Sequence, residues 1–315
     1  MSITIVIPVK NDAVRLRRCL ASIARIAGSS APDIIVADNG SSDDSPAVAA
    51  AAGARVMTVP NVAVGELRNA AAQSASGDLL AFIDADHELG DGWFDAAAES
   101  FRNTEVGAAG ALYLAPADGT WVQKMYGALR GETSGTHETG WLGSGNLVVR
   151  RELFAKLNGF DTRLEACEDV DLCRRIRGAG MKVLADERFR SIHHGDPPTL
   201  RALFRAERWR GRDNLRVSLR GPFDVRDLPS IMTPILTLSG LAALIPAVLG
   251  VRSAMIVAAA ALFAVLGMTS IRIARMAGRL NDASPLTLAR AFAVSLTYEA
   301  ARAIALVTRA SHHRR

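Results

Sequence analysis

The sequence predicts an open, doubly wound α/β sheet flanked by helices, followed by a membrane-inserted helical hairpin. Two observations lead to this fold class. Short apolar segments rich in β-branched residues alternate with helical segments up to about residue 84, and a long region almost free of charge begins at residue 231. Continuous apolar strands that alternate with helices are typical of a parallel sheet buried on both faces. The 315 residues suffice for one large domain or two ordinary ones.

The first part of the chain contains four expected strands, at residues 3–9, 33–38, 54–59 and 78–84. The run at 3–9 is too short for a signal peptide and has no positive region before it, so we expect this part to stay in the cytosol. Ligands of open α/β sheets bind beyond the carboxyl ends of the strands. Those ends carry Asp12, Asp38, Asp84 and Asp86, so we expect the ligand there.

The order of elements is less regular between Asp91 and Asp196. We expect a helix at 91–103, strands at 106–114 and 146–151, a helix at 169–179, and a strand pair within 181–193. The segment 195–200 should open one more helix, which carries many arginines and ends at Gly221-Pro222.

Two apolar segments predict a membrane hairpin. Residues 231–250 are twenty without a charge, residues 253–271 are nineteen, and a bilayer requires about 20. Arginines follow the second segment, which is consistent with a return to the cytoplasmic side. A pair of buried core helices is the alternative. The segment 284–308 begins with Ser284-Pro285 and predicts an amphipathic interfacial helix or a third span.

The overall composition narrows the class of protein. The net charge is +5, and the acidic residues are concentrated before about residue 227. This basic, apolar C-terminal part favours a membrane surface, and it lacks the interleaved basic and aromatic residues typical of nucleic-acid binding. The three cysteines show no metal-ligand spacing, which indicates reduced thiols.

The stretch LLAFIDADHE ends an apolar strand with Asp84 and Asp86. Two carboxylates one residue apart suit a hard divalent cation such as Mg²⁺ or Mn²⁺. A solvated turn or a helix cap is the structural alternative. An aspartyl phosphatase would use the first carboxylate as nucleophile, but that chemistry belongs on the first strand and this is the fourth. A dinucleotide oxidoreductase would need G-x-G-x-x-G, which the first turn lacks.

Further charged groups lie downstream. Four acids lie at the start of an expected helix, where the helix dipole favours carboxylates: Glu165, Glu168, Asp169 and Asp171. One of them could act as a general base. Arg205, Arg208 and Arg212 precede the membrane region and could bind phosphate or anionic lipid. His193, at the end of the last expected strand, could contact a metal or a diphosphate.

Taken together, these segments resemble glycosyltransferase family 2, in particular membrane-anchored bacterial-type members with a GT-A fold. The resemblance covers about residues 1–215 and rests on ITIVIPVKND, VADNGSSD, GELRNAAAQSASGDLLAFIDAD, GSGNLVVRRELFAKLNGFD, CEDVDLCRRIRGAG and RAERWRGR. The GT-A fold is an open, mostly parallel sheet flanked by helices. The implied domains are a catalytic domain at 1–222, the hairpin at 223–280 and a final helix with a basic tail at 281–315.

The resemblance also implies a site. The implied nucleotide-sugar-binding residues are Pro8, Asp12, Asp38, Arg68, Asp84, Arg208, Trp209 and Arg212. Asp84 and Asp86 match the family's Asp-x-Asp, and together with His193 they are the expected metal ligands. Asp169 matches the catalytic base. The expected acceptor-side residues are Trp141, Gly145, Asn146 and Glu168.

The expected function is transfer of a sugar from a nucleotide sugar, with UDP-sugars first, to a glycan or lipid-linked acceptor at the cytoplasmic face of the cell inner membrane. The reaction should depend on Mg²⁺ or Mn²⁺ and invert the anomeric configuration. Arg205 replaces the glutamine of the polymerising members, so single addition is expected. A membrane-anchored scaffold that only binds nucleotide sugars is the alternative.

Overall fold

The computed structural model describes residues 1–28, 32–220 and 228–308. The chain forms two compact units, and each is described by itself. The first takes in residues 1–116 and 132–195, and the second takes in 117–131 and the described residues from 196 onward. The helix end expected at Gly221-Pro222 lies outside the described residues, as do the start of the predicted hairpin segment at 223 and the basic tail. The three-domain division stays a prediction.

The first unit is built on an eight-stranded sheet in the order β3-β2-β1-β4-β8-β6-β9-β7. Its strands are β1 (Ile3–Val9), β2 (Asp33–Asp38), β3 (Arg55–Thr58), β4 (Leu79–Ile83), β6 (Val106–Gly110), β7 (Thr136–Glu138), β8 (Asn146–Arg150) and β9 (Lys182–Asp186). The first four strands are parallel, β8 runs antiparallel between β4 and β6, and β7 is antiparallel to β9. The expected open, mostly parallel sheet is confirmed.

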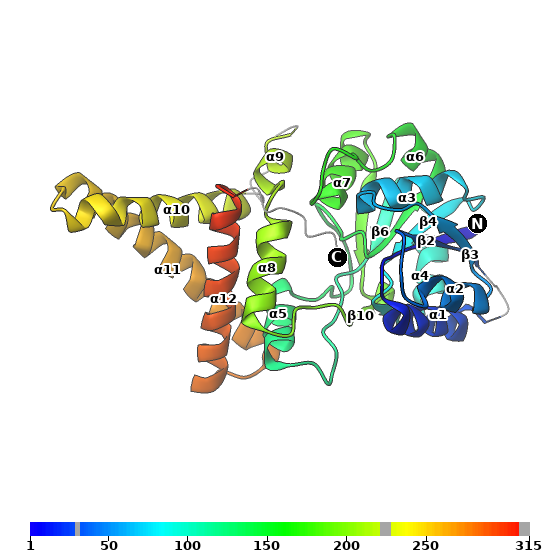
Figure 1. Ribbon diagram of the computed structural model, residues 1–315, viewed down its shortest axis with the longest axis horizontal. Coiled ribbons are helices and arrows are strands. Elements are labelled where there is room, and N and C mark those ends of the chain that lie inside the picture. The colour runs from blue at the N-terminus through cyan, green and yellow to red at the C-terminus, as the bar shows by residue number, and fades with distance from the viewer. Residues whose placement is uncertain (29–31, 221–227, 309–315) are drawn as a thin grey trace. The chain divides into compact units, whose positions relative to one another are not determined.

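Helices cover both faces of this sheet (Figure 1). They are α1 (Ala13–Ala27), α2 (Ser45–Ala51), α3 (Val64–Gln73), α4 (Trp93–Ser100), α6 (Arg151–Lys156) and α7 (Glu168–Gly178). Alternate residues of β1 point to opposite faces: Ile5 packs in the apolar cluster with Leu16 of α1, and Val6 packs in the cluster with Leu67 of α3. The central strands β1, β4, β6 and β8 are largely apolar because both of their faces are buried, whereas the edge strands β3 and β7 are mostly exposed.

A second, two-stranded antiparallel sheet pairs β5 (His87–Leu89) with β10 (Ser191–His193). The expected strand pair within 181–193 is therefore wrong, because β9 joins the large sheet and β10 joins the small one. Between them lies a 3₁₀ turn (Glu187–Phe189). The Asp186 carboxylate caps this turn by accepting a hydrogen bond from Arg188 N. This turn redirects the chain away from the large sheet.

The second unit is helical, and its described helices are α5 (Trp121–Arg130), α8 (Leu200–Arg210), α9 (Asn214–Ser218), α10 (Leu228–Val248), α11 (Arg252–Leu280) and α12 (Pro285–Ala305). Its core includes Met125, Leu203, Met276 and Val294. The predicted helix after residue 195 begins at Leu200, where Thr199 accepts from Ala202 N, and it already ends at Arg210. Sequence analysis did not predict α5.

Helices α10 and α11 are long and apolar enough to cross a membrane, and only 17% and 11% of their most apolar windows are buried. They match the two predicted spans, although α11 extends beyond residue 271 to Leu280. In α12, Ser284 caps the helix by accepting from Thr287 N, and Pro285 occupies the first turn, as predicted.

Candidate active site

The loops after β1 and β2 are bonded to each other at the carboxyl end of the sheet. Asn11 has a left-handed backbone (φ 53°), and its amide oxygen accepts from Ser42 N at 2.7 Å. Asp38 is buried, and its two carboxylate oxygens accept from Ser41 N at 3.1 and 3.2 Å. Pro8 lies in β1 opposite Ala37, one residue before the level of Asp38. These residues form one edge of the candidate site.

The first carboxylate of the Asp-x-Asp pair is held by an arginine. Asp84 follows the last residue of β4, and Arg68 Nη2 of α3 donates to its Oδ1 at 2.6 Å. Arg68 Nη1 donates to Glu168 Oε1 of α7 at 2.9 Å. The guanidinium is buried and also stacks over Phe160, with its carbon 5.6 Å from the ring centre. Arg68 therefore connects two acidic motifs, at Asp84 and at Glu168, that lie 84 residues apart in sequence.

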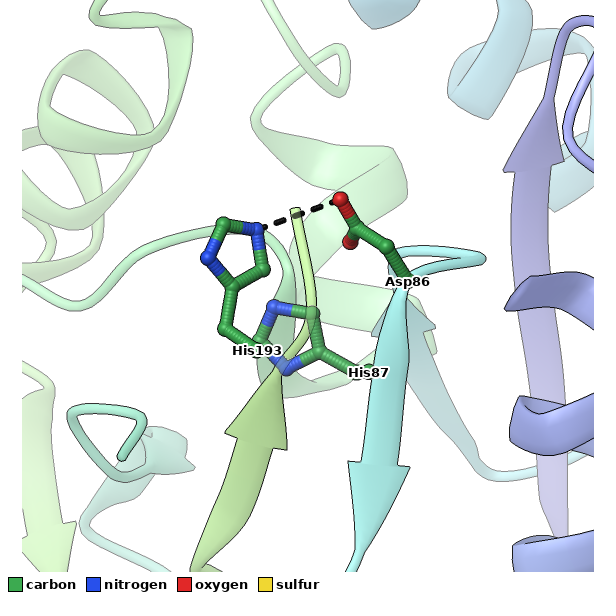
Figure 2. A group of neighbouring side chains, drawn as sticks. All are labelled: Asp86, His87 and His193. Carbon is green, nitrogen blue, oxygen red and sulfur yellow. Dashed lines mark ion pairs between the residues drawn. The ribbon is translucent and has the colours of Figure 1, made fainter. Parts of the chain in front are cut away.

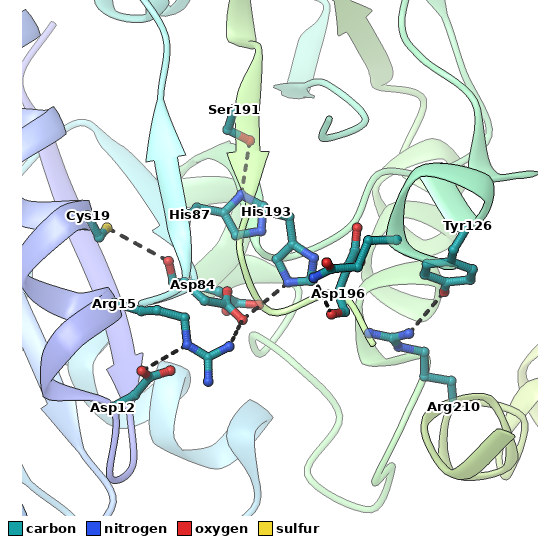
Figure 3. Close-up of polar contacts among 12 residues, drawn as sticks. Asp12, Arg15, Cys19, Asp84, His87, Tyr126, Ser191, His193, Asp196 and Arg210 are labelled. Atoms are coloured by element: carbon teal, nitrogen blue, oxygen red, sulfur yellow. Dashed lines mark hydrogen bonds and ion pairs between the residues drawn. The ribbon is translucent and has the colours of Figure 1, made fainter. Parts of the chain in front are cut away.

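The second carboxylate has different partners. Asp86 Oδ2 lies 3.2 Å from His193 Nε2 and 3.9 Å from Arg15 Nη1, and Arg15 also donates to Asp12 at 2.9 Å (Figure 3). Asp86 Oδ1 is buried and has no hydrogen-bond partner among the described residues. Burial opposes ionisation of Asp86, but the adjacent His193 and then His87 hold its pKa well below the usual range. A side chain at Gly195 would overlap this carboxylate.

Asp86 belongs to a cluster with two histidines (Figure 2). One potential ligand atom from each of Asp86, His87 and His193 lies within 4.8 Å of the others. The Tyr113 ring packs against both imidazoles, with ring centres 4.9 Å from His87 and 4.6 Å from His193. Sequence analysis placed His193 here but assigned no role to His87 or Tyr113. The position of His87 directly after the Asp-x-Asp pair was the available signal.

This cluster fits a divalent cation. A carboxylate and imidazoles are donors that divalent metals accept in proteins. The Oδ1 atom of Asp86 also supports a cation site, since it is buried and has no hydrogen-bond partner among the described residues. A buried carboxylate oxygen in this state is costly unless a cation or water satisfies it.

The predicted base lies at the start of α7. Asp169 Oδ1 accepts from Val170 N at 2.8 Å, and its Oδ2 accepts from Ser144 N at 3.2 Å. Burial raises the pKa of Asp169 despite these bonds. For Glu168, burial and then the charge of Asp169 raise the pKa to about 7, against the effect of Arg68. A carboxylate with a raised pKa and a fixed orientation is suited to accept a proton.

The predicted acceptor-side residues differ in their surroundings. Trp141 is 45% exposed, whereas Asn146 is fully buried. The Asn146 side chain accepts from Trp93 Nε1 at 2.9 Å and donates to Ser191 Oγ at 3.2 Å, so it supports β10 from within the core. A methyl group on Gly145 would lie 2.8 Å from Asp84 Oδ2 and 2.9 Å from His87 Nε2, so this glycine leaves space between them. Acceptor contacts by these residues stay a prediction.

The remaining predicted residues belong to the second unit. Arg208 and Trp209 lie in the last turn of α8, and Arg212 follows that helix. Beside them Glu207 is fully buried and accepts from Tyr126 Oη at 2.6 Å and from Arg302 Nε at 2.8 Å. Burial opposes ionisation here, yet the charges of Arg302 and Arg210 lower the pKa of Glu207 to about 2. Arg210 also donates to Tyr126 Oη (Figure 3). Donor binding by Arg208, Trp209 and Arg212 stays a prediction.

Comparison with known proteins decides the family. Residues 4–157 match the family described as Glycosyl transferase family 2. This part of the chain is a family 2 glycosyltransferase domain. The matched residues span β1 to α6 and include both carboxylates of the Asp-x-Asp pair, so the predicted resemblance to this family is confirmed.

Two curated relatives support this assignment. The O-antigen biosynthesis protein RfbC of Myxococcus xanthus is 33% identical over 152 residues, which are 41% of this chain and 12% of that protein. The pre-mycofactocin glycosyltransferase of Mycobacterium tuberculosis (strain H37Rv) is 28% identical over 196 residues, which are 58% of this chain and 40% of that protein. The chain thus spans less than half the length of these curated relatives.

Solved structures confirm the GT-A fold. The mannosyltransferase PcManGT of Pyrobaculum calidifontis, in complex with GDP-Man and Mn²⁺, superposes with a TM-score of 0.66 at 17% identity, over 97% of this chain and 86% of that one. GalNAc-T7 with UDP, GalNAc and Mn²⁺ superposes with a TM-score of 0.50 at 18% identity, over 72% of this chain and 53% of that one.

Proposed function

We propose that this glycosyltransferase moves a sugar from a nucleoside-diphosphate sugar to an acceptor hydroxyl with the help of a divalent cation. One observation carries the proposal. Arg68 bonds both Asp84 and Glu168, so the strand-end motif that bears Asp86 and the helix start that bears Asp169 lie together at one end of the sheet. A cation site beside a carboxylate with a raised pKa is the arrangement that this transfer requires.

Asp86 and His193 would hold the cation, and PcManGT and GalNAc-T7 were both solved with Mn²⁺. When bound, the cation supplies positive charge that offsets the negative charge developing on the diphosphate. Asp38 and Pro8 border the nucleotide in this proposal. A UDP-sugar is the first donor to test, because GalNAc-T7 was solved with UDP. A GDP-sugar is the second, because PcManGT was solved with GDP-Man.

Asp169 serves as the general base. Its carboxylate takes the proton of the acceptor hydroxyl while the acceptor oxygen forms a bond to the anomeric carbon. The bond from that carbon to the diphosphate oxygen breaks, and its electron pair leaves with the nucleoside diphosphate. Because attack comes from the side opposite the leaving group, the anomeric configuration inverts.

Helices α10 and α11 would anchor the enzyme in the cell inner membrane, with the catalytic unit in the cytoplasm. Their low burial and high hydropathy support this placement, and RfbC is named for O-antigen biosynthesis. An enzyme anchored at the bilayer encounters lipid-linked acceptors, so we propose a glycan or lipid-linked acceptor and one addition for each encounter.

The proposal is tested by nucleotide release from a panel of UDP-, GDP- and dTDP-sugars with the full chain in detergent. We expect release with Mn²⁺, its loss with EDTA, and its loss in Asp169→Asn once an acceptor is present. Donor binding without any release or transfer, across the panel and with both lipid-linked and soluble acceptors, would instead indicate a nucleotide-sugar-binding scaffold.

A further inference from the structure

The proposed cation site has a second histidine, His87, that the proposed function does not use. We propose that His87 is a protein ligand of the cation together with Asp86 and His193, and that this donor set makes the site prefer Mn²⁺ to Mg²⁺. The inference rests on the proposed function, because it concerns the same site.

The small sheet aligns the two imidazoles. His87 of β5 lies directly opposite His193 of β10 in the antiparallel register, and directly opposed residues project their side chains from the same face. Their ring centres are 4.8 Å apart. Asp86 precedes His87 in the chain, and the potential ligand atoms of all three residues lie within 4.8 Å of one another. Three donors from two paired strands thus converge on one point.

A chain of buried groups fixes the orientation of His87. Its Nδ1 lies 2.9 Å from Ser191 Oγ, and Asn146 Nδ2 donates to the same hydroxyl oxygen at 3.2 Å. Trp93 Nε1 in turn holds the Asn146 amide. In the proposed site His87 Nδ1 donates its proton to Ser191, which leaves the lone pair of the ring on Nε2 for the cation. Metal-binding histidines are commonly oriented by such a bond from the other ring nitrogen.

The surroundings of Asp84 favour His87 over Asp84 as the third ligand. Asp84 Oδ1 already accepts the charged Arg68 guanidinium at 2.6 Å, and this guanidinium is buried. Recruiting Asp84 to the cation would bring a second positive charge close to Arg68. His87 adds a ligand without adding charge.

The donor set predicts selectivity. Mg²⁺ prefers oxygen ligands in an octahedral arrangement, whereas imidazole nitrogens suit transition metals. Two imidazoles and one carboxylate should therefore bind Mn²⁺ more tightly than Mg²⁺.

The test is direct binding of MnCl₂ to the full chain in detergent. Free Mn²⁺ is measured by its electron paramagnetic resonance signal, and MgCl₂ is then added as a competitor. In His87→Asn the amide can still bond Ser191 but cannot reach the position of Nε2. We expect this variant to bind Mn²⁺ about tenfold more weakly and to lose the preference over Mg²⁺. The matched control is His194→Asn, whose histidine bonds Glu88 instead; its Mn²⁺ affinity should be unchanged.

A second measurement needs no variant. Pulsed electron paramagnetic resonance of Mn²⁺ bound to the parent protein detects directly coordinated imidazole nitrogens, and we expect two. Parent-like Mn²⁺ binding by His87→Asn, or one coupled imidazole in the parent, would overturn the role of His87 while leaving metal-dependent transfer intact. Absence of both Mn²⁺ and Mg²⁺ binding by the parent would overturn this inference together with the metal dependence in the proposed function.

Discussion

The Arg68 guanidinium and the Asp84 carboxylate form a 2.6 Å ion pair at the end of β4. The same arginine bonds Glu168, so one buried guanidinium lies between two carboxylates that would otherwise repel each other. The arrangement ties the position of α7, which carries Asp169, to the strand end that carries Asp86.

Replacing Arg68 tests this connection. Arg68→Met leaves Glu168 buried without its partner and should lower the free energy of unfolding by about 3 kcal/mol, the scale for breaking a buried ion pair. Thermal unfolding of the full chain in detergent measures the loss. Arg163→Met is the matched control, because Arg163 is 76% exposed and its pair with Asp161 should contribute little. Equal melting temperatures for both variants would contradict the structural role of Arg68.

Replacing Asp169 separates binding from chemistry. Asp169→Asn keeps an oxygen that can accept from Ser144 N but removes the base, so we expect the transfer rate to fall by about 10²- to 10⁴-fold. Donor affinity, measured by calorimetry, should stay within about twofold of the parent value. Asp161→Asn, in the loop before α7, serves as the control with parent-like rate. A parallel loss of donor affinity and rate in Asp169→Asn would assign Asp169 to donor binding.

The raised pKa of Glu168 predicts a pH dependence of stability. Burial and the charge of Asp169 raise this pKa from 4.5 to about 7 in the folded protein. Between these values the folded state keeps a proton that the unfolded chain has released, so this group's contribution to stability is present below pH 4.5 and is lost as the pH rises to about 7. In Glu168→Gln the melting temperature should depend less on pH across this window. The control is Glu66→Gln, at an exposed residue, which should leave the pH dependence of the melting temperature as in the parent. The same pH dependence in Glu168→Gln as in the parent would refute the raised pKa of Glu168.

Much of the fold could be predicted because the central strands of the first unit, such as β1 and β4, are largely apolar. A segment such as 3–9 alternates its side chains between two buried faces, which leaves a clear signal in sequence. The three-residue strands β5, β7 and β10 are too short for any periodicity, and β9 could not be distinguished from β10 without the 3₁₀ turn between them. Helix α5 was missed because it lies after an irregular segment and packs with residues much later in the chain.

Most predicted site residues of the first unit lie at one end of its sheet because parallel strands bring their carboxyl ends together. The sequence could not show that Asp84 and Asp86 have different partners. Arg68 comes from a separate helix, and His87 is oriented by Ser191, which lies 104 residues later in the chain. Such contacts depend on tertiary packing, and residue spacing does not report them.

The exposed apolar surface of α11 predicts membrane insertion. Phe263, near the middle of the predicted span, is 82% exposed. Phe263→Asp should weaken insertion by about 2.5–3.5 kcal/mol and increase the fraction extracted from membranes by alkaline carbonate. Phe263→Leu is the control and should remain in the membrane fraction. Complete extraction of the parent protein by carbonate would contradict a spanning role for α11.

The central claim is that a cation held by Asp86 and His193 binds the donor diphosphate. Calorimetric titration of UDP, and then of GDP, into the full chain with Mn²⁺ and again with EDTA tests it most directly. The account predicts that at least one nucleotide binds with Mn²⁺, and that EDTA or Asp86→Asn weakens this binding by about tenfold or more. The control is Asp91→Asn, at an exposed residue, and this variant should bind the nucleotide as tightly as the parent does. Nucleotide affinity that is equal with Mn²⁺ and with EDTA would contradict the claim.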